Sequence, residues 1–562
     1  MAQNKINKLE LTWIDKEDEP LAVEPRLLLD TPEYSFGEVE TGTLPNGKPW
    51  PGNMLIHGDN LLALRALEEN FAGQIKCIYI DPPYNTGHAF DQYDDSLEHS
   101  IWLNLMRNRL IILHNLLSND GSLWVTLDDC EAHYFKVMCD EIFGRSNFVA
   151  STIWQHAVQS KGYPGKFSLH HNYTFCYRKT EKFSLNSLER TAKHNINYSN
   201  PDNDPNGPWR AGDVRNSLVR PNLMYDITTP SGKTIHHPEK GWRFSRDTFE
   251  SELASGKIKF SDDESRIIRK IYLKDQQGRV PETLWFAEEV GTTREANGEI
   301  KALELPESFD TPKPERLIER VITLATNPGD IVLDSFLGSG TTSAVAHKMG
   351  RRWIGVELGN HAYTVCFPRL RKVVEGEQGG ISKSQNWQGG GGFKFYELAP
   401  SLLNHDKYGN LVINKEYNAD MLAAAMAKHQ GFTFSPDAEL YWKQGHSSEH
   451  DFIFTTTQLI TAEMLETIHD QLGEDESLLI CCTKFQPECR NKFPNITIKK
   501  IPKVLLDTCE FDRDDYSLNI VSVPDIDDEE REDIQPDGEF DNVGEISTNH
   551  INGEPNLFSS VE

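Results

Sequence analysis

Apolar and polar residues follow one another along much of the chain in a pattern typical of an α/β protein. A short strand and turn, MLIHGD, is expected at 54–59. It precedes helical apolar spacing at 60–70 and a buried-strand run, IKCIYI, at 75–80. Helical spacing returns at 101–117, and a further strand, SLWVTL, is expected at 122–127. Strands that alternate with helices favour a mainly parallel sheet covered by helices on both faces.

This alternation stops between residues 151 and 290, where Asn, Pro, Gly and aromatic residues are frequent. We expect that stretch to be a separate inserted domain with many loops. After it, the spacing predicts a helix at 317–326 and a strand at 331–334. A glycine-containing loop and a helix then lead to another strand at 353–357. The two α/β stretches therefore flank the insertion and are expected to form one domain.

The chain has 562 residues, of which 38% are apolar and 25% charged, and these values exclude a wholly disordered chain. We divide it into six expected regions: an N-terminal arm (1–50), the first part of an α/β domain (51–150), an inserted domain (151–290), the second part of the α/β domain (291–400), a C-terminal α/β domain (401–523) and an acidic tail of disordered composition (524–562).

The formal net charge of −29 is unevenly distributed. From residue 504 to 562 there are 18 acidic and 2 basic residues, a net charge of −16. From 151 to 290 there are 21 basic and 17 acidic residues, a net charge of +4. A basic segment inside an acidic protein is a candidate for contact with a polyanion.

Other sequence features narrow the class of protein. No run of about 18 uncharged apolar residues is present, so we expect no membrane span. The first residues lack the apolar core of a signal peptide, which points to the cytoplasm. The nine cysteines include no CxxC pair, and we expect neither a disulfide framework nor a metal site.

The first motif that indicates chemistry is Asp81-Pro82-Pro83-Tyr84, directly after the strand at 75–80. Asp-Pro-Pro is also an ordinary turn, but ligands of open α/β sheets bind at the carboxyl ends of the strands. Two prolines remove two N–H donors, which leaves carbonyls and the Asp81 carboxylate as acceptors. Such a patch suits an exocyclic amine of a base, and Tyr84 can lie against the flat face of that base.

The second motif runs from Asp334 to Thr342, DSFLGSGTT, between a strand and a helix. Its Gly-x-Gly permits close approach of a ligand to the backbone. Glu357 follows Gly338 by 19 residues, near the spacing at which an acidic residue reaches ribose hydroxyls. The loop lacks both the lysine of a triphosphate-binding loop and a third glycine typical of nicotinamide cofactors. A nucleoside ligand without phosphates, such as S-adenosylmethionine, fits better.

Together the two motifs resemble those of the amino-methyltransferases of DNA, in the group whose target-base motif precedes the cofactor motif. The residues in and around the motifs are similar to those of the modification subunits of type III restriction systems. The resemblance extends to three further segments: His57-Gly-Asp59, Val290-Gly-Thr-Thr293 and Thr311-Pro-Lys-Pro314.

The resemblance implies a Rossmann-like methyltransferase fold with a mostly parallel central sheet, an inserted target-recognition domain and an additional C-terminal α/β region. It assigns the target base to the catalytic residues Asp81, Pro82, Pro83 and Tyr84. It assigns S-adenosylmethionine to Asp59, Lys313, Asp334, Phe336, Gly338, Gly340, Thr341 and Glu357. For Asp59 the alternative is a turn-forming residue with no ligand.

The implied activity is sequence-specific methylation of adenine N6 in double-stranded DNA, on a base flipped out of the helix, within a restriction-modification or related defence system. The resemblance further implies a homodimer and a possible helicase–nuclease partner. Three alternatives stay open: a cytosine-N4 methyltransferase, an RNA methyltransferase, and a non-catalytic DNA-binding subunit of a defence complex.

Overall fold

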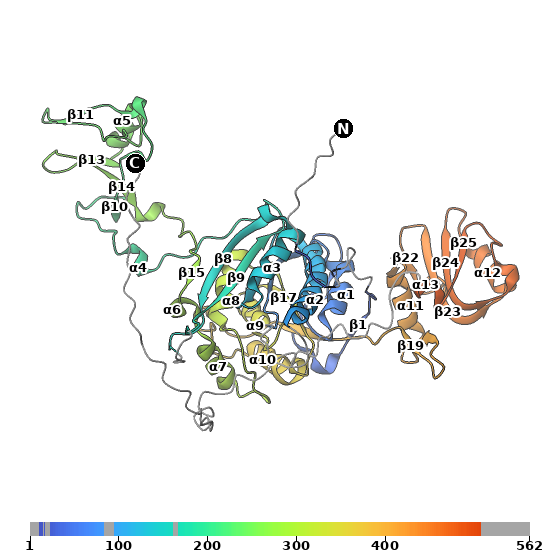
Figure 1. The fold of residues 1–562 in the computed structure, drawn as a ribbon. Helices are drawn as coiled ribbons and strands as arrows, with labels where there is room; N and C mark the ends of the chain where they lie inside the picture. The colour runs from blue at the N-terminus through green and yellow to red at the C-terminus, as the bar shows by residue number, and fades with distance from the viewer. Residues whose placement is uncertain (1–10, 15, 17–22, 84–94, 161–166, 507–562) are drawn as a thin grey trace, which may run out of the picture. The chain divides into compact units, whose positions relative to one another are not determined.

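The α/β domain is built around a sheet of 11 strands, the central sheet (Figure 1). The computed structural model describes residues 11–14, 16, 23–83, 95–160 and 167–506. Ten strands follow one another across the sheet: β1 (Leu28–Asp30), β18 (Gly392–Leu398), β5 (Asn53–His57), β17 (Arg352–Glu357), β16 (Ile331–Asp334), β6 (Ile75–Ile80), β7 (Leu117–Leu127), β9 (His171–Arg178), β8 (Phe148–Gln155) and β15 (Leu284–Trp285). The strands from β18 to β7 run parallel, which confirms the predicted mainly parallel α/β sheet.

Helices cover both faces of this sheet because its buried strands are apolar on both sides. In β6, Ile78 and Ile80 join the apolar core under one set of helices, whereas Cys77 and Tyr79 join the core on the opposite face. The first face carries α1 (Asn60–Phe71), α2 (Asp95–Leu116) and α3 (Ala132–Cys139). The second carries α8 (Glu315–Ala325), α9 (Thr341–Lys348) and α10 (Phe367–Val374), with α7 (Thr293–Ala302) ahead of them in the chain.

Several predicted boundaries differ from the structure, and three of the differences change how the chain is divided. The strand expected at 122–127 begins at Leu117, because Ile75 already pairs with Leu117 before a shift in register. The arm at 1–50 supplies β1 and β2 (Phe36–Gly37), which pair antiparallel with β18, so part of it belongs to the central sheet. The boundary at 151 lies inside β8, and β8, β9 and β15 all belong to the central sheet rather than to the insertion.

The remainder of the inserted region has a small core of its own, built around Trp242, Phe244 and Phe249. Its elements are α4 (Ala192–Asn195), β10 (Trp209–Gly212), β11 (Ile227–Thr228), β12 (Thr234–Ile235), α5 (Arg246–Ala254), β13 (Ile258–Phe260) and β14 (Ile267–Tyr272). Strands β10, β14 and β13 form one antiparallel sheet, and β11 pairs with β12. The loop-rich character that the composition predicts is therefore observed around a compact aromatic core.

The C-terminal region contains a second, smaller sheet in the order β21-β22-β23-β24-β25. Its elements are β19 (Leu403–His405), β20 (Leu411–Ile413), α11 (Ala419–His429), β21 (Thr433–Phe434), β22 (Gly445–His446), β23 (Asp451–Ile460), α12 (Ala462–Gln471), β24 (Ser477–Phe485), β25 (Ile496–Lys500) and α13 (Lys503–Leu506). Strands β23, β24 and β25 run parallel, in agreement with the α/β pattern expected there. Across the described ranges, no helix combines the length and apolarity that a membrane crossing needs.

Candidate active site

The two sequence motifs meet at one edge of the central sheet. In the register of the sheet, Leu333 of β16 pairs with Ile78 of β6, so the carboxyl ends of these neighbouring strands lie together. Asp81 directly follows β6, and Asp334 ends β16. On the other side of β16, β17 ends at Glu357. Three carboxylates from segments far apart in the sequence are thereby brought to the same edge.

The loop after β16 is held by its own first carboxylate. Asp334 Oδ1 accepts a hydrogen bond from the Phe336 N–H at 2.9 Å, and Oδ2 accepts one from Thr342 Oγ1 at 2.6 Å. Gly338 and Gly340 have φ angles of +56° and +81°, a region that favours glycine. Gly340 is the N-cap of α9, so the loop delivers backbone N–H groups to the edge of the sheet.

The second carboxylate, Glu357, ties this loop to β17. Its Oε2 accepts from the Gly338 N–H at 2.7 Å and its Oε1 accepts from the Gly359 N–H at 3.0 Å. The Gly58 N–H donates to the Glu357 carbonyl at 3.0 Å, which brings the segment His57-Gly-Asp59 to the same place. Each carboxylate oxygen can accept a further hydrogen bond, so Glu357 still has capacity for hydroxyl donors.

Burial makes both carboxyls easier to protonate than usual. Desolvation raises the pKa of Asp334 to about 7, and the negative charges of Asp81 and Glu357 add to that rise. Desolvation also raises the pKa of Glu357. A positively charged ligand at this edge would therefore be favoured, because it would relieve the cost of placing several carboxylates together.

The Asp81 carboxylate forms an ion pair with Lys313 through Oδ2 and Nζ. Asp81, predicted to bind the target base, and Lys313, predicted to bind the cofactor, thus contact each other. The carbonyl of Pro83 accepts a hydrogen bond from the buried Trp102 Nε1 at 2.9 Å, which fixes the end of the turn. Pro82 is buried, and Tyr84 lies outside the described residues.

Asp59 is engaged in capping a helix. Its Oδ1 accepts from the N–H groups of Leu61 and Leu62 at 2.9 and 3.1 Å, and it is the N-cap of α1. Arg109 of α2 donates to its Oδ2 at 3.2 Å. These contacts match the turn-forming interpretation of Asp59, and its contact with a cofactor stays a prediction.

Thr341 lies buried at the start of α9, and its hydroxyl is used inside the protein. Arg369 Nη1 donates to Thr341 Oγ1 at 2.8 Å and to the Ser339 carbonyl at 3.1 Å. The same guanidinium donates through Nη2 to Glu315 Oε1 at 3.0 Å, and Glu315 also binds Lys348. A buried ion network of Arg369, Glu315 and Lys348 therefore fixes the loop. The contact of Thr341 with a ligand stays a prediction.

Sequence patterns did not reveal several residues that shape the site. Arg109 donates to Asn60 Oδ1, and Asn60 Nδ2 donates to the Ser335 carbonyl at 2.7 Å, so α2 also supports the loop. Phe309 lies against Gly338, where a Cβ would be only 3.0 Å from the ring. Arg369 and Arg109 belong to no recognisable motif. Glu315, which begins α8 directly after a proline, was a possible signal of the buried ion network.

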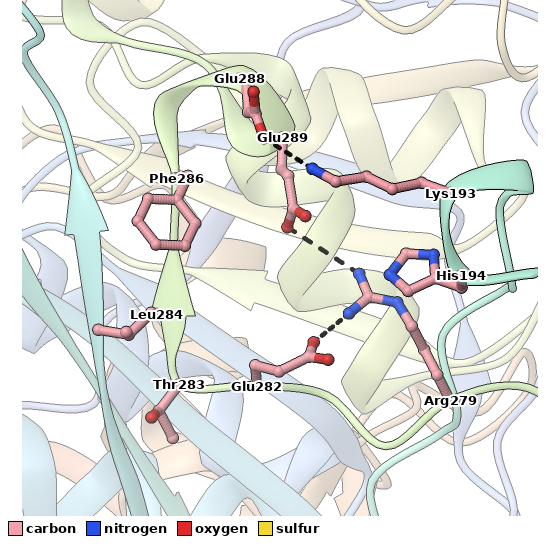
Figure 2. Close-up of a pocket in the computed structure, with 9 residues that line it drawn as sticks. All are labelled: Lys193, His194, Arg279, Glu282, Thr283, Leu284, Phe286, Glu288 and Glu289. Carbon is pink, nitrogen blue, oxygen red and sulfur yellow. Dashed lines mark hydrogen bonds and ion pairs between the residues drawn. The ribbon is translucent and has the colours of Figure 1, made fainter. Parts of the chain in front are cut away.

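A cavity of about 400 Å³ lies elsewhere, beside α4, β15 and α6 (Ala287–Val290) (Figure 2). Figure 2 shows Lys193 reaching Glu288 and Arg279 lying between Glu282 and Glu289. Lys193 and Arg279, which line this cavity, are thus each paired with carboxylates. None of the predicted site residues lines it.

A family model described as DNA methylase matches residues 75–367, which is more than half of the chain and includes both motifs. The chain belongs to this DNA methylase family. The match begins with β6 and ends at the start of α10, so it spans the two strands whose ends carry Asp81 and Asp334.

Several named proteins are similar to this member of the family. "Probable type III restriction-modification enzyme HindVI Mod subunit" of Haemophilus influenzae is 33% identical over 407 residues, 62% of this chain and 54% of that protein. The type III StyLTI Mod subunit of Salmonella typhimurium is 32% identical over 363 residues, 58% and 54% of the two chains. The EcoP15I Mod subunit of Escherichia coli is 26% identical over 522 residues, 75% and 79% of the two chains. The chain spans about half the length of the first two.

Solved structures with some likeness to the chain include a DNA methyltransferase. The PvuII enzyme, titled cytosine-N4-specific, is 17% identical, with 58% of this chain and 90% of that chain covered and a TM-score of 0.33. A complex titled M1.HpyAVI-SAM is 15% identical, with 56% and 99% covered and a TM-score of 0.29. Scores this low add nothing to the assignment, which depends on the family match and on the strand register of the chain.

The raised pKa of Asp334 predicts how stability depends on pH. The folded protein holds a proton on this carboxyl up to about pH 7, whereas the unfolded chain releases it near 3.8. The contribution of Asp334 to stability is therefore greatest below about pH 4 and is lost as the pH rises to about 7. Asp334→Asn should remove this dependence, which amounts to at most roughly 4 kcal/mol in the free energy of unfolding. Urea unfolding at a series of pH values measures it.

The exposed Asp262→Asn is a suitable control, and it should follow the wild type at every pH. Equal pH dependence in the wild type and Asp334→Asn would contradict a protonated, buried Asp334.

Proposed function

We propose that the protein transfers a methyl group from S-adenosylmethionine to the N6 amine of an adenine in DNA. The observation that carries this proposal is the register of β6 and β16, which puts Asp81 beside the loop from Asp334 to Gly340. The Asp81 carboxylate, which can accept a hydrogen bond from an amine, thereby lies next to a loop that suits a nucleoside. The base is inaccessible within a duplex, so it must be flipped into the site at a cost of a few kcal/mol.

The cofactor loop has features that suit S-adenosylmethionine. The Ser335 hydroxyl is buried and has no hydrogen-bond partner among the described residues, so it is available to a bound group. Glu357 would accept ribose hydroxyls, and the buried Asp334 would bind the positive amino-acid end. Phe336 is partly buried and flanks the loop, where it would contact the adenine ring. When bound, S-adenosylmethionine supplies an electrophilic methyl group on a positively charged sulfur.

The chain supplies the acceptors that activate the target amine. Asp81 accepts one hydrogen of the amine, and the Pro82 carbonyl accepts the other, since the Pro83 carbonyl already binds Trp102. Two acceptors allow the nitrogen to localise its lone pair, which would form the new nitrogen–methyl bond. The methyl–sulfur bond would break at the same time, and its electron pair would stay on the sulfur. The two acceptors stabilise the transition state more than the ground state, because the nitrogen becomes positive beside fixed acceptors. Asp81 can then take the proton that the methylated nitrogen must lose.

We propose further that the protein is the modification component of a restriction-modification system in the bacterial cytoplasm. The similar proteins from Haemophilus, Salmonella and Escherichia are named as type III Mod subunits. The inserted region would read the DNA sequence, the protein would act as a homodimer, and a helicase–nuclease subunit would be its partner. The basic balance between residues 151 and 290 supports contact with DNA phosphates.

Replacing the catalytic carboxylate should separate methyl transfer from cofactor binding. Asp81→Ala removes an acceptor made for the amine and leaves the loop after β16 unchanged, so kcat should fall at least roughly a hundredfold. The dissociation constant for S-adenosylmethionine, measured by calorimetry, should change much less. The exposed Asp475→Ala in the C-terminal region serves as control. Equal loss of both properties would contradict the separate role of Asp81.

The identity of the product tests the proposed base and polymer. DNA and RNA incubated with the protein and labelled S-adenosylmethionine should be digested to nucleosides and analysed by mass spectrometry. We expect N6-methyldeoxyadenosine, absent from the reaction with Asp81→Ala. N4-methyldeoxycytidine would instead show a cytosine enzyme, a methylated ribonucleoside an RNA enzyme, and no methylated product a non-catalytic subunit.

A further inference from the structure

Lys313 lies where its positive charge opposes the proposed reaction. Its ammonium pairs with Asp81 Oδ2, and the two side chains are only 11% and 21% exposed. If the pair persisted, the lysine would compete with the target amine for the carboxylate. It would also place a positive charge beside a nitrogen that is becoming positive. Opening the ion pair would therefore make Oδ2 available to the amine and remove the opposing charge.

The backbone around Lys313 is held on both sides, so the side chain is the part that can move. On one side, Phe309 packs against Gly338 and against the ring of His361, with ring centroids 5.3 Å apart. On the other side, Glu315 is fixed by buried ion pairs with Lys348 and Arg369.

The residues next to Lys313 restrict its backbone further. Pro312 and Pro314 flank it, and each proline fixes a φ angle. Pro314 also packs against Gly291, where an added Cβ would lie 2.9 Å from the proline ring. The flexible four-carbon stem of the lysine retains its freedom in this rigid setting.

The charges of the site explain where the lysine belongs before and after ligand binding. Burial raises the pKa of Asp334, and the negative charges of Asp81 and Glu357 add to that rise. Lys313 pairs with Asp81 and offsets part of the negative charge at this edge. S-adenosylmethionine has a sulfonium and an ammonium that can replace that positive charge. It also has a carboxylate, which offers the lysine a new partner.

We propose that Lys313 is the counter-ion of Asp81 until S-adenosylmethionine binds, and that it then moves to the cofactor carboxylate and uncovers Asp81 for the target amine. This inference rests on the proposed function. Its consequence is an order of recognition: the site distinguishes a base with an N6 amine from one without it only after the cofactor is bound.

The test compares binding of two DNA duplexes that differ in one amine. One has adenine at the position mapped as methylated, and the other has purine, which lacks the N6 amine. Affinities are measured by fluorescence anisotropy with and without sinefungin, a non-reactive analogue with an ammonium in place of the sulfonium. The variants are Lys313→Met, which removes the cation, Lys313→Arg, which keeps it, and Lys301→Met, an exposed control on α7.

For the wild type, Lys313→Arg and Lys301→Met, we expect a preference for adenine over purine only when sinefungin is present. The preference should be roughly tenfold to a hundredfold, the range that a hydrogen bond to a charged group gives. Lys313→Met should show the preference without sinefungin, and it should bind sinefungin more weakly than the wild type does. Lys313→Gln allows the same comparison if thermal unfolding shows that the methionine variant is not folded.

The proposal is overturned if Lys313→Met needs sinefungin as much as the wild type does, or if the wild type prefers adenine without it. Failure of the proposed function looks different, because the wild type would then bind no sinefungin and methylate no DNA. The direct methylation assay on the wild type therefore separates the two failures.

Discussion

The concentration of negative charge at one sheet edge is the constraint on which the site depends. Neighbouring parallel strands end at the same edge of the sheet, so the residues that follow them lie close together. Here the strands β6, β16 and β17 deliver Asp81, Asp334 and Glu357 to the same edge. Buried carboxylates so close together are costly unless a cation or a proton offsets the charge. The edge is therefore suited to a cationic nucleoside, and its ionisation state should depend on what is bound.

A buried ion network beneath the loop keeps this edge rigid. Arg369 links Glu315 to the Ser339 carbonyl, and Lys348 binds Glu315 from the other side. Such networks contribute little net stability compared with apolar packing, but losing one partner leaves a charge uncompensated. Glu299 of α7 accepts from the Glu315 N–H at 3.1 Å, and burial raises its pKa to about 7. The start of α8 and the glycine loop are thus fixed relative to each other.

The sequence predicted the fold class and the edge at which the motifs meet, because buried parallel strands have continuous apolar runs that are easy to recognise. The strand at 331–334 has the predicted bounds. The early start of β7 at Leu117 was missed because Asn119-Asp120-Gly121 resembles a turn. The ion pair of Lys313 with Asp81 joins residues 232 positions apart. Such contacts depend on how the strands are ordered in the sheet, and apolar spacing does not encode that order.

The way in which the inserted region leaves the sheet separates that region from the candidate site. The chain departs after β9 and returns at β15, and both strands pair with β8 at the same end of the sheet. Between them, the backbones of Leu188 and Arg279 exchange hydrogen bonds of 3.0 and 2.8 Å and close the neck of the insertion. Strand β7 separates β9 from β6, the strand that precedes Asp81, and β16, which ends at Asp334, is the next strand after β6. Changes beyond the neck therefore leave the register of β6 and β16 intact, so the inserted region can vary in sequence without disturbing the candidate site.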